Sequence, residues 1–260
     1  MASSKPLIEL KDVTLNRGGR IALDSVSLHL DRRTLLGLIG PNGAGKTSLL
    51  KVILGELEPE SGEVFLDGIP HKKALRERWP IGYLPQHHTF ESLIPITGFE
   101  AVMMGRFGRM GIFRSPSEED RKAVLVALER INALDLADKL ISELSGGQIQ
   151  RIFIARALAS ESPVLLLDEP EAGIDRETAD RFMRLLSDLR DKLDLGIILV
   201  SHDIGMITRN ADVVACINHK LHFHDKPVKL DGSALSEVFG EECELLIHSY
   251  PIRQLEGHDD

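Results

Sequence analysis

The segment Gly40–Thr47 (GPNGAGKT) has the residue types and spacing of a phosphate-binding loop, because it fits the pattern G-x-x-x-x-G-K-[ST]. The apolar run Leu35–Ile39 precedes it and a helical pattern follows, which is the strand-loop-helix context that such a loop needs. Its glycines let backbone N–H groups turn toward phosphate oxygens, and the Lys46 ammonium can reach the β- and γ-phosphates of a nucleotide. We expect the Thr47 hydroxyl to hold Mg²⁺.

Two adjacent carboxylates end a second apolar run, Val164–Pro170 (VLLLDEP). We expect Asp168 at the carboxyl edge of a parallel sheet, where ligands bind in open α/β folds. There it would orient Mg²⁺ through water, while Glu169 is placed to polarise an attacking water. An acidic pair after a strand is also a common helix start, so the functional interpretation depends on the phosphate-binding loop upstream.

A third motif, Leu144–Gln148 (LSGGQ), predicts a second anion site. Ser145 and Gln148 have capping-box spacing, so a helix should begin at Ser145 and run through Ile149–Ala159, with two glycines leaving its first N–H groups uncovered. One nucleotide does not need two helix N-termini from distant parts of a chain, so we expect this one to hold the γ-phosphate bound by another copy. Taken in isolation, the pentapeptide favours a helix cap alone.

Length, composition and charge restrict the class of protein. The chain has 260 residues, of which 43% are hydrophobic and 27% charged, so one soluble α/β domain with an insertion is the simplest interpretation. No apolar run approaches the roughly 20 residues that span a bilayer, and the first residues lack a signal-peptide core. The cysteines, Cys216 and Cys243, have no metal or disulfide spacing, which favours a cytosolic protein. The net charge of −9 argues against nucleic-acid binding.

The order of apolar patterns predicts an α/β fold with two kinds of sheet. Residues Ile8–Leu15 and Val26–Leu30 alternate apolar and polar side chains, which indicates an antiparallel segment with one face in water. Later apolar runs are continuous, as in a parallel sheet with helices on both faces. Residues 87–160 show no strand-like alternation and predict an inserted helical lobe. Within it, Ser117 followed by Asp120 indicates a cap and an acidic first turn, so a helix should begin there. Residues 226–260 predict a peripheral C-terminal tail.

Taken together and in this order, the three motifs resemble those of the ABC ATPase family over nearly the full length, to about residue 225. The resemblance implies a P-loop ATPase core, a single nucleotide-binding domain over residues 1–260, and ATP with Mg²⁺ as cofactors. It also implies that Gln86 contacts Mg²⁺ and water, that His202 contacts the γ-phosphate, and that Ala172–Asp175 crosses a dimer interface.

The expected site residues fall into three groups. Catalytic roles are assigned to Glu169, His202, Lys46 and Gln86. Magnesium contacts are assigned to Thr47, Gln86 and Asp168. Nucleotide contacts are assigned to Gly40, Pro41, Asn42, Gly43, Ala44, Gly45, Lys46, Thr47, Ser48 and Arg17 and, toward the nucleotide of another copy, to Ser145, Gly146, Gly147 and Gln148.

The lobe further resembles that of importer ATPases that serve zinc, manganese or iron. Their Pro-Ile-Thr, Met-Gly-Arg and Ser-x-Glu-x-Asp-like elements match Pro95–Thr97, Met104–Arg106 and Ser117–Asp120. This resemblance implies a head-to-tail homodimer on the inner face of the cell membrane, integral membrane permease subunits and an extracytoplasmic substrate-binding protein, without nucleic acid.

Other functions within the same family stay open. A related importer could serve siderophores, haem or another small nutrient, and a non-transport ABC ATPase could regulate a membrane complex. Soluble ABC proteins that act on DNA or ribosomes carry coiled coils, zinc modules or two cassettes, whereas the segment between Gln86 and Leu144 is short and has no heptads.

Several residues depart from the family pattern. Arg17 stands where relatives place an aromatic residue that stacks on adenine, and a guanidinium can also stack on a ring. Glu171 adds a carboxylate after the acidic pair, and Asp225 replaces a usual glycine, which leaves the alignment of the tail open. Several histidines are interpreted as surface strand residues rather than a metal site, because no cysteine or carboxylate has matching spacing. They are His87, His88, His219, His222 and His224.

Overall fold

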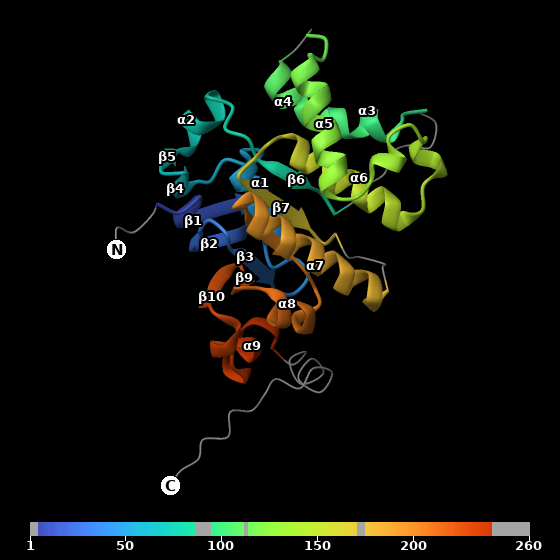
Figure 1. Cartoon of the computed structure of the whole chain (residues 1–260). Coiled ribbons are helices and arrows are strands. Elements are labelled where there is room, and N and C mark those ends of the chain that lie inside the picture. The colour runs from blue at the N-terminus through green and yellow to red at the C-terminus, as the bar shows by residue number, and fades with distance from the viewer. Residues whose placement is uncertain (1–4, 87–94, 112–113, 171–174, 241–260) are drawn as a thin grey trace.

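The computed structural model describes residues 5–86, 95–111, 114–170 and 175–240, and its strands form two sheets (Figure 1). The first sheet has the order β2-β1-β4-β5, and its neighbouring strands are antiparallel. This arrangement confirms the predicted antiparallel opening of the chain. The strands of this sheet are β1 (Ile8–Arg17), β2 (Arg20–Leu30), β4 (Ser61–Leu66) and β5 (Ile69–Pro70).

The second sheet has the order β10-β9-β3-β8-β7-β6 and is parallel except for the pairing of β9 with β10. In its ladders Leu38 lies opposite Val200, which in turn lies opposite Asp168, so three strands end at one edge of the sheet. The strands of this sheet are β3 (Leu35–Ile39), β6 (Gly82–Leu84), β7 (Val164–Asp168), β8 (Gly196–Val200), β9 (Val213–Asn218) and β10 (Lys220–Asp225).

The helices fall into two groups, which Figure 1 shows in different parts of the molecule. Those near the sheets are α1 (Lys46–Leu54), α2 (His71–Arg76), α7 (Arg176–Leu193), α8 (Ile204–Asn210) and α9 (Gly232–Phe239). Those of the helical lobe are α3 (Gly98–Met103), α4 (Phe107–Met110), α5 (Glu118–Arg130) and α6 (Gly146–Ala159). Short 3₁₀ helices are η1 (Met104–Arg106), η2 (Leu134–Leu136), η3 (Ile141–Glu143) and η4 (Pro227–Lys229). Among the described residues, no helix is both long and apolar enough to cross a membrane.

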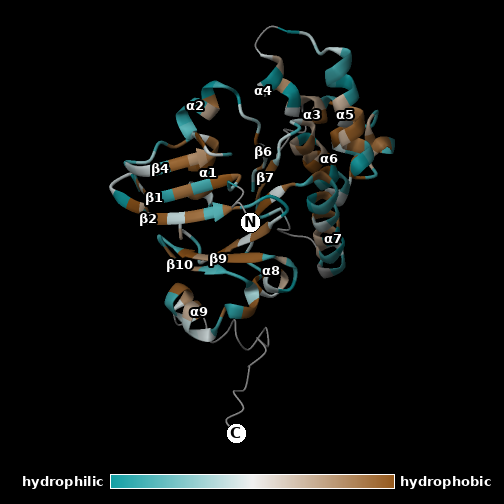
Figure 2. Cartoon of the chain, turned by 60° about the vertical axis from the view of Figure 1, so that its left-hand side comes forward, coloured by the Kyte–Doolittle hydropathy of each residue, from teal (hydrophilic) through white to brown (hydrophobic). Residues whose placement is uncertain are grey.

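Alternate side chains of the central strands enter two apolar cores. In β7, Val164 and Leu166 belong to the core that includes residues of β1, β2 and α1, whereas Leu165 and Leu167 belong to the core that includes residues of α6 and α7. Figure 2 shows apolar residues along strands such as β4 and β9 and hydrophilic residues on α2. Burial on both faces explains why the sequence of β7 has no polar alternation.

The described part of the helical lobe begins its helices as the sequence indicates. A capping box formed by Thr97 and Glu100 starts α3, and another formed by Ser117 and Asp120 starts α5. The predicted helix start at Ser117 is therefore confirmed. Helices α3, α5 and α6 pack on one another. The boundaries of the lobe as an insertion, 87–160, stay an interpretation.

A buried ion network joins the lobe to the segment that leads into β7. The Arg106 side chain is 3% exposed, and it donates to Asp120 Oδ1 at 2.9 Å and to Glu161 Oε2 at 2.6 Å. The exposed Arg109 donates to the same Glu161 oxygen at 2.8 Å. Hydrogen bonds from Ser117, with a further contribution from Arg106, hold the pKa of Asp120 below its usual value against the effect of burial. The network thus connects η1, α5 and the residue that follows α6 by two positions.

The described C-terminal part packs on the second sheet. Helix α9 lies against β9, with Leu235 and Val238 buried, and Asn218 Nδ2 donates to the Val238 carbonyl at 3.0 Å. Residues 241–260 lie outside the described residues. The predicted peripheral tail, 226–260, therefore stays a prediction as a whole.

We expect Arg106→Met to lower the free energy of unfolding by about 3 kcal/mol, because removing one member of a buried ion network leaves other charges without their partner. Urea unfolding at neutral pH measures the loss. Because the pKa of Asp120 is lower in the folded state, this carboxylate stabilises the fold at pH values above the ordinary aspartate pKa. That stabilisation is lost as the pH falls through the folded-state pKa. Arg109→Met is the exposed control and should cost less than about 1 kcal/mol. Equal losses in both variants would contradict a role for burial.

Candidate active site

The glycine-rich loop lies between β3 and α1, and neighbouring backbone leaves no room for a side chain at Gly40 or Gly45. A Cβ on Gly40 would lie 2.0 Å from the carbonyl oxygen of Ile217 in β9, and one on Gly45 would lie 2.4 Å from that of Ala22 in β2. Gly45 has φ 98° and ψ 2° and forms the N-cap of α1 without a side-chain hydrogen bond. The first N–H groups of α1 are therefore available to an anion.

Lys46 is 6% exposed and folds back on this loop. Its Nζ donates to the carbonyl oxygens of Gly40 at 2.7 Å and Pro41 at 3.0 Å. Burial lowers the pKa of Lys46, and the carboxylates of Glu169 and Asp168 oppose that shift. The ammonium thus lies between loop carbonyls and the acidic pair, where a phosphate group can become a further partner.

Asp168 ends β7 and is 1% exposed. Neither of its carboxylate oxygens accepts a hydrogen bond of good geometry from the described residues, although the Thr47 hydroxyl is near enough to favour the ionised form. Burial is the main cause that raises the pKa of Asp168; the Thr47 hydroxyl and the Lys46 ammonium act in the opposite direction. A buried carboxylate without hydrogen bonds is unfavourable, and such oxygen ligands suit a hard cation such as Mg²⁺.

Glu169 is the point at which the ends of three neighbouring strands meet. Its backbone has φ 51°, a region that non-glycine residues rarely adopt, and its N–H donates to the Val200 carbonyl at 3.1 Å. Its Oε2 accepts a hydrogen bond from Gln86 Nε2 at 2.5 Å, and its Oε1 lies 2.5 Å from His202 Nε2. The order β6-β7-β8 therefore brings Gln86 and His202 to one carboxylate.

The segment Ser145–Gln148 opens a separate helix N-terminus. Helix α6 begins at Gly146, directly after Ser145 as predicted, and the Ser145 N–H donates to Gln148 Oε1 at 2.9 Å. Ser145 and Gly146 are exposed, and a Cβ on either glycine of the motif would meet nothing within 4 Å. Within the described part of the chain, no hydrogen bond connects this segment with the loop Gly40–Ser48.

Two other predicted contact residues lie at the ends of elements. Arg17 ends β1 at an exposed position opposite Arg20 of β2, and no described hydrogen bond joins it to the phosphate-binding loop. Asp175 is the N-cap of α7, and its side chain accepts a hydrogen bond from the Thr178 N–H at 3.0 Å. The rest of the expected interface segment, residues 172–174, and Glu171, which differs from the family pattern, lie outside the described residues.

Gln150 also contacts this edge, although the sequence motifs do not single it out. It lies in the second turn of α6, and its Nε2 donates to the carbonyl oxygen of Pro170, the residue after Glu169, at 2.9 Å. The sequence feature that could have indicated Gln150 is its amide next to the apolar residues of the same helix. Such an amide needs a hydrogen-bond partner when it is buried.

The C-terminal histidines His219, His222 and His224 lie within or directly before β10. In the ranges that the structure describes, no group of three or more His, Cys, Asp or Glu side chains can hold a metal ion. His222 Nδ1 lies 3.5 Å from a carboxylate oxygen of Glu237. His87 and His88 are outside the described residues.

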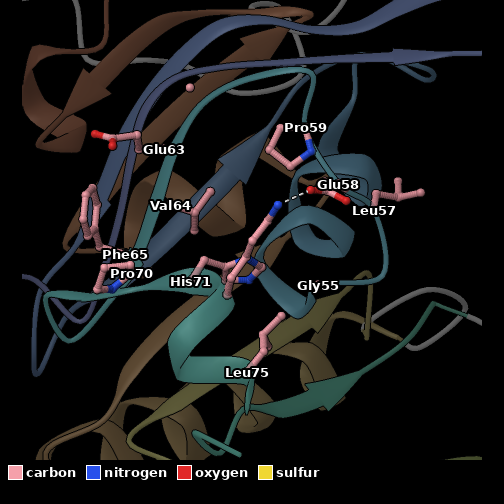
Figure 3. Close-up of a pocket in the computed structure, with 12 residues that line it drawn as sticks. Gly55, Leu57, Glu58, Pro59, Glu63, Val64, Phe65, Pro70, His71 and Leu75 are labelled. Atoms are coloured by element: carbon pink, nitrogen blue, oxygen red, sulfur yellow. Dashed lines mark ion pairs between the residues drawn. The ribbon is translucent and has the colours of Figure 1, made fainter. Parts of the chain in front are cut away.

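A cavity of about 390 Å³ lies away from these residues, beyond the end of α1 (Figure 3). Its lining comes from the turn after α1, from β4 and from the region of α2, and includes the ion pair between Lys72 and Glu58. None of the expected site residues lines it. The edge of the second sheet that carries the phosphate-binding loop and the acidic pair is therefore the candidate active site.

Comparison with known proteins decides the family. The sequence model of the ABC transporter family matches residues 23–172, more than half of the chain. The chain belongs to the ABC transporter family. The manganese transport system ATP-binding protein MntA of Synechocystis sp. is 39% identical over 209 residues, which cover 80% of this ABC chain and 79% of that protein. The zinc uptake system ATP-binding protein ZurA of Listeria innocua is 36% identical over 230 residues, which cover 88% and 86%.

The fold agrees with this family. A dimeric bacterial ABC transporter cassette of known structure has a TM-score of 0.70 and 30% identity to this chain, and the match covers 85% of this chain and 98% of that chain. The predicted P-loop ABC ATPase fold is thus confirmed, and the ABC cassette is the ATP-binding and ATP-hydrolysing subunit of a transporter. The roles assigned to its single residues stay predictions.

We expect Gly40→Ala to destabilise the ABC cassette by about 1–3 kcal/mol, because the added methyl group would meet a backbone carbonyl rather than a movable side chain. The same variant should lose ATP affinity, since the loop must shift to accommodate the methyl group. Thermal unfolding and ATP titration measure the two effects. Gly146→Ala is the matched control for stability, because its methyl group would enter open space. Wild-type stability in Gly40→Ala would contradict the close backbone approach.

Proposed function

We propose that this ABC cassette energises the uptake of a metal ion, which is manganese, zinc or iron, through a separate membrane permease. The observation that carries this proposal is the similarity to the ATP-binding subunits of a manganese and a zinc system over most of each chain. The segment Met104–Arg106, which resembles that of metal importers, supports the same class, and its Arg106 is part of the buried ion network.

The residues at the sheet edge fit a nucleotide with its magnesium ion. The uncapped N-terminus of α1 and the Lys46 ammonium would bind the phosphates. The Asp168 carboxylate, which accepts no well-formed hydrogen bond from the described residues, and the Thr47 hydroxyl would hold Mg²⁺, with Gln86 as a further contact. When bound, Mg²⁺ neutralises charge on the phosphates, and Lys46 contributes a second positive charge to them.

Glu169 is best placed to accept a proton from the attacking water. The Gln86 amide and His202 Nε2 hold its two carboxylate oxygens, so its orientation is set by groups from the two neighbouring strand ends. When water and phosphate enter, the Nε2–H of His202 can donate to the γ-phosphate instead. Such positioning supplies most of the catalysis in phosphoryl transfer, because the protein has little covalent chemistry to perform.

The exposed N-terminus of α6 would complete the nucleotide site of another copy. Ser145 and the glycines after it have open space around them, and a cassette similar to this one forms a dimer of known structure. In a head-to-tail homodimer, each ATP would lie between the loop Gly40–Ser48 of one copy and the segment Ser145–Gln148 of the other. Arg17 would then contact the adenine.

The remaining partners follow from a transport role. The helical lobe and the segment around Gln86 would contact cytoplasmic loops of the permease, so that closing and opening of the dimer changes access through the membrane. The cassette would lie on the inner face of the cell membrane, and an extracytoplasmic substrate-binding protein would deliver the metal ion. Nucleic acid has no part in this scheme.

Glu169→Gln should reduce steady-state ATP hydrolysis by at least about 100-fold, because an amide cannot accept the proton. ATP binding should persist, so ATP-bound dimers should accumulate and be visible by size-exclusion chromatography. Adding Ser145→Arg should abolish these dimers, since a large cation would fill the N-terminus of α6. Wild-type turnover in Glu169→Gln would exclude this residue as the base, and dimers that survive in the double variant would exclude the head-to-tail arrangement.

Uptake measurements in cells test the metal proposal. Cells that lack this chain should accumulate less manganese, zinc or iron, and the wild-type chain should restore uptake. Lys46→Ala should not restore it, because the phosphates lose their buried ammonium. Radioactive ions at equal external concentration provide the measurement, with siderophore-bound iron and haem as alternative substrates. If the wild-type chain restores uptake of siderophore-bound iron or haem alone, that compound replaces the metal ion as the proposed substrate. If cells that lack the chain take up all of these compounds at the wild-type rate, a transport role is contradicted.

A further inference from the structure

A buried amide joins the helix that begins after Ser145 to the backbone beside Glu169. Gln150 is 8% exposed, and its Nε2 donates to the Pro170 carbonyl oxygen at 2.9 Å. Pro170 directly follows Glu169 in the chain. A hydrogen bond therefore connects the second turn of α6 with the residue after the proposed base.

Gln150 differs in chemistry from the residues buried near it on α6, such as Ile152, Phe153 and Ile154. An amide in such surroundings loses its water and is favourable only where it is hydrogen-bonded, whereas a methionine would fill a similar volume without that loss. Pro170 has no N–H, so its carbonyl is its one backbone hydrogen-bonding group. The bond thus constrains Pro170 in a way that apolar packing would not.

The constrained backbone is also strained. The φ of 51° at Glu169 is a conformation that is unfavourable for a non-glycine residue and persists only where its surroundings hold it. On the N-terminal side of its Cα, the Glu169 N–H donates to the Val200 carbonyl at 3.1 Å. On the C-terminal side, the carbonyl of the next residue, Pro170, accepts a hydrogen bond from Gln150. These two bonds hold the chain on both sides of Glu169.

We propose that Gln150 is a positioning residue for Glu169 and that it transmits the position of α6 to the active site of its own chain. This inference rests on the proposed function, in which the N-terminus of α6 contacts the nucleotide of another copy. When that contact shifts α6, Gln150 shifts the Pro170 carbonyl, and the orientation of Glu169 changes with it. Each base thereby responds to the nucleotide in the opposite site.

Gln150→Met tests the positioning role, because it keeps the volume and removes the donor. Its kcat for ATP hydrolysis should fall about 10- to 100-fold, the size of effect that a small misplacement has, while its KM stays within about twofold. Arg151→Met is the matched control on α6, since Arg151 donates to the Asn132 carbonyl at 3.1 Å within the lobe, and it should keep the wild-type kcat. A wild-type kcat in Gln150→Met overturns the inference.

Mixed dimers of two differently tagged full-length chains separate positioning from damage to α6. The first dimer carries Glu169→Gln and Gln150→Met in one chain, opposite a wild-type chain. The second carries the two substitutions in opposite chains. Each dimer has one working base, but only in the second does the chain with that base lack Gln150. Single-turnover hydrolysis in the first should match a dimer of Glu169→Gln with wild type, and in the second it should fall at least about tenfold below it.

Two outcomes of the mixed-dimer experiment would overturn the inference. A slower first dimer would show that Gln150→Met acts on the contact between α6 and the opposite nucleotide. Equal rates in both dimers would show that Gln150 does not act on its own chain. Failure of the proposed function is detected separately, because Glu169→Gln homodimers would then hydrolyse ATP at the wild-type rate.

Discussion

The active site depends on the buried carboxylate of Asp168. Among the described residues none gives its oxygens a well-formed hydrogen bond, and an ionised carboxylate in such surroundings is unfavourable unless a positive charge compensates it. Lys46 and the Thr47 hydroxyl compensate in part, yet burial still keeps the pKa of Asp168 raised. The ionised form of Asp168 is therefore disfavoured in the folded chain. A cation that enters with a nucleotide would favour the ionised form, and a ligand that binds only the folded chain also stabilises the fold.

The order and register of the second sheet hold this carboxylate in place. Asp168 lies opposite Val200, and the residues beyond the ends of β6 and β8, Gln86 and His202, meet on the adjacent Glu169. Strand β3 pairs with β8 and places Lys46 near the same edge. A slip of one residue would turn each side chain of β7 to the opposite face and separate these groups.

The sequence predicted features that depend on local pattern, and the structure confirms the start of α5 at Ser117 and of α6 at Ser145. Long-range bonds were not predictable in this way. The bond from Gln150 to Pro170 needs the packing of a helix on a strand end, and an amide inside an apolar helical sequence carries no sign of its partner. Likewise β2 begins at Arg20, before its clear alternation, because pairing with β1 extends the hairpin to its turn.

Helix α6 is held at its far end but open at its start. Near its C-terminus, Arg106 donates to the carbonyl of Ala159 and to Glu161, which connects the helix to the rest of the lobe. At its N-terminus, Ser145 is exposed. The ion network thus couples the C-terminal end of α6 to α5 and η1. If a nucleotide of another copy contacts Ser145, as we propose, a shift of α6 would reach the acidic pair through the bond from Gln150 to Pro170.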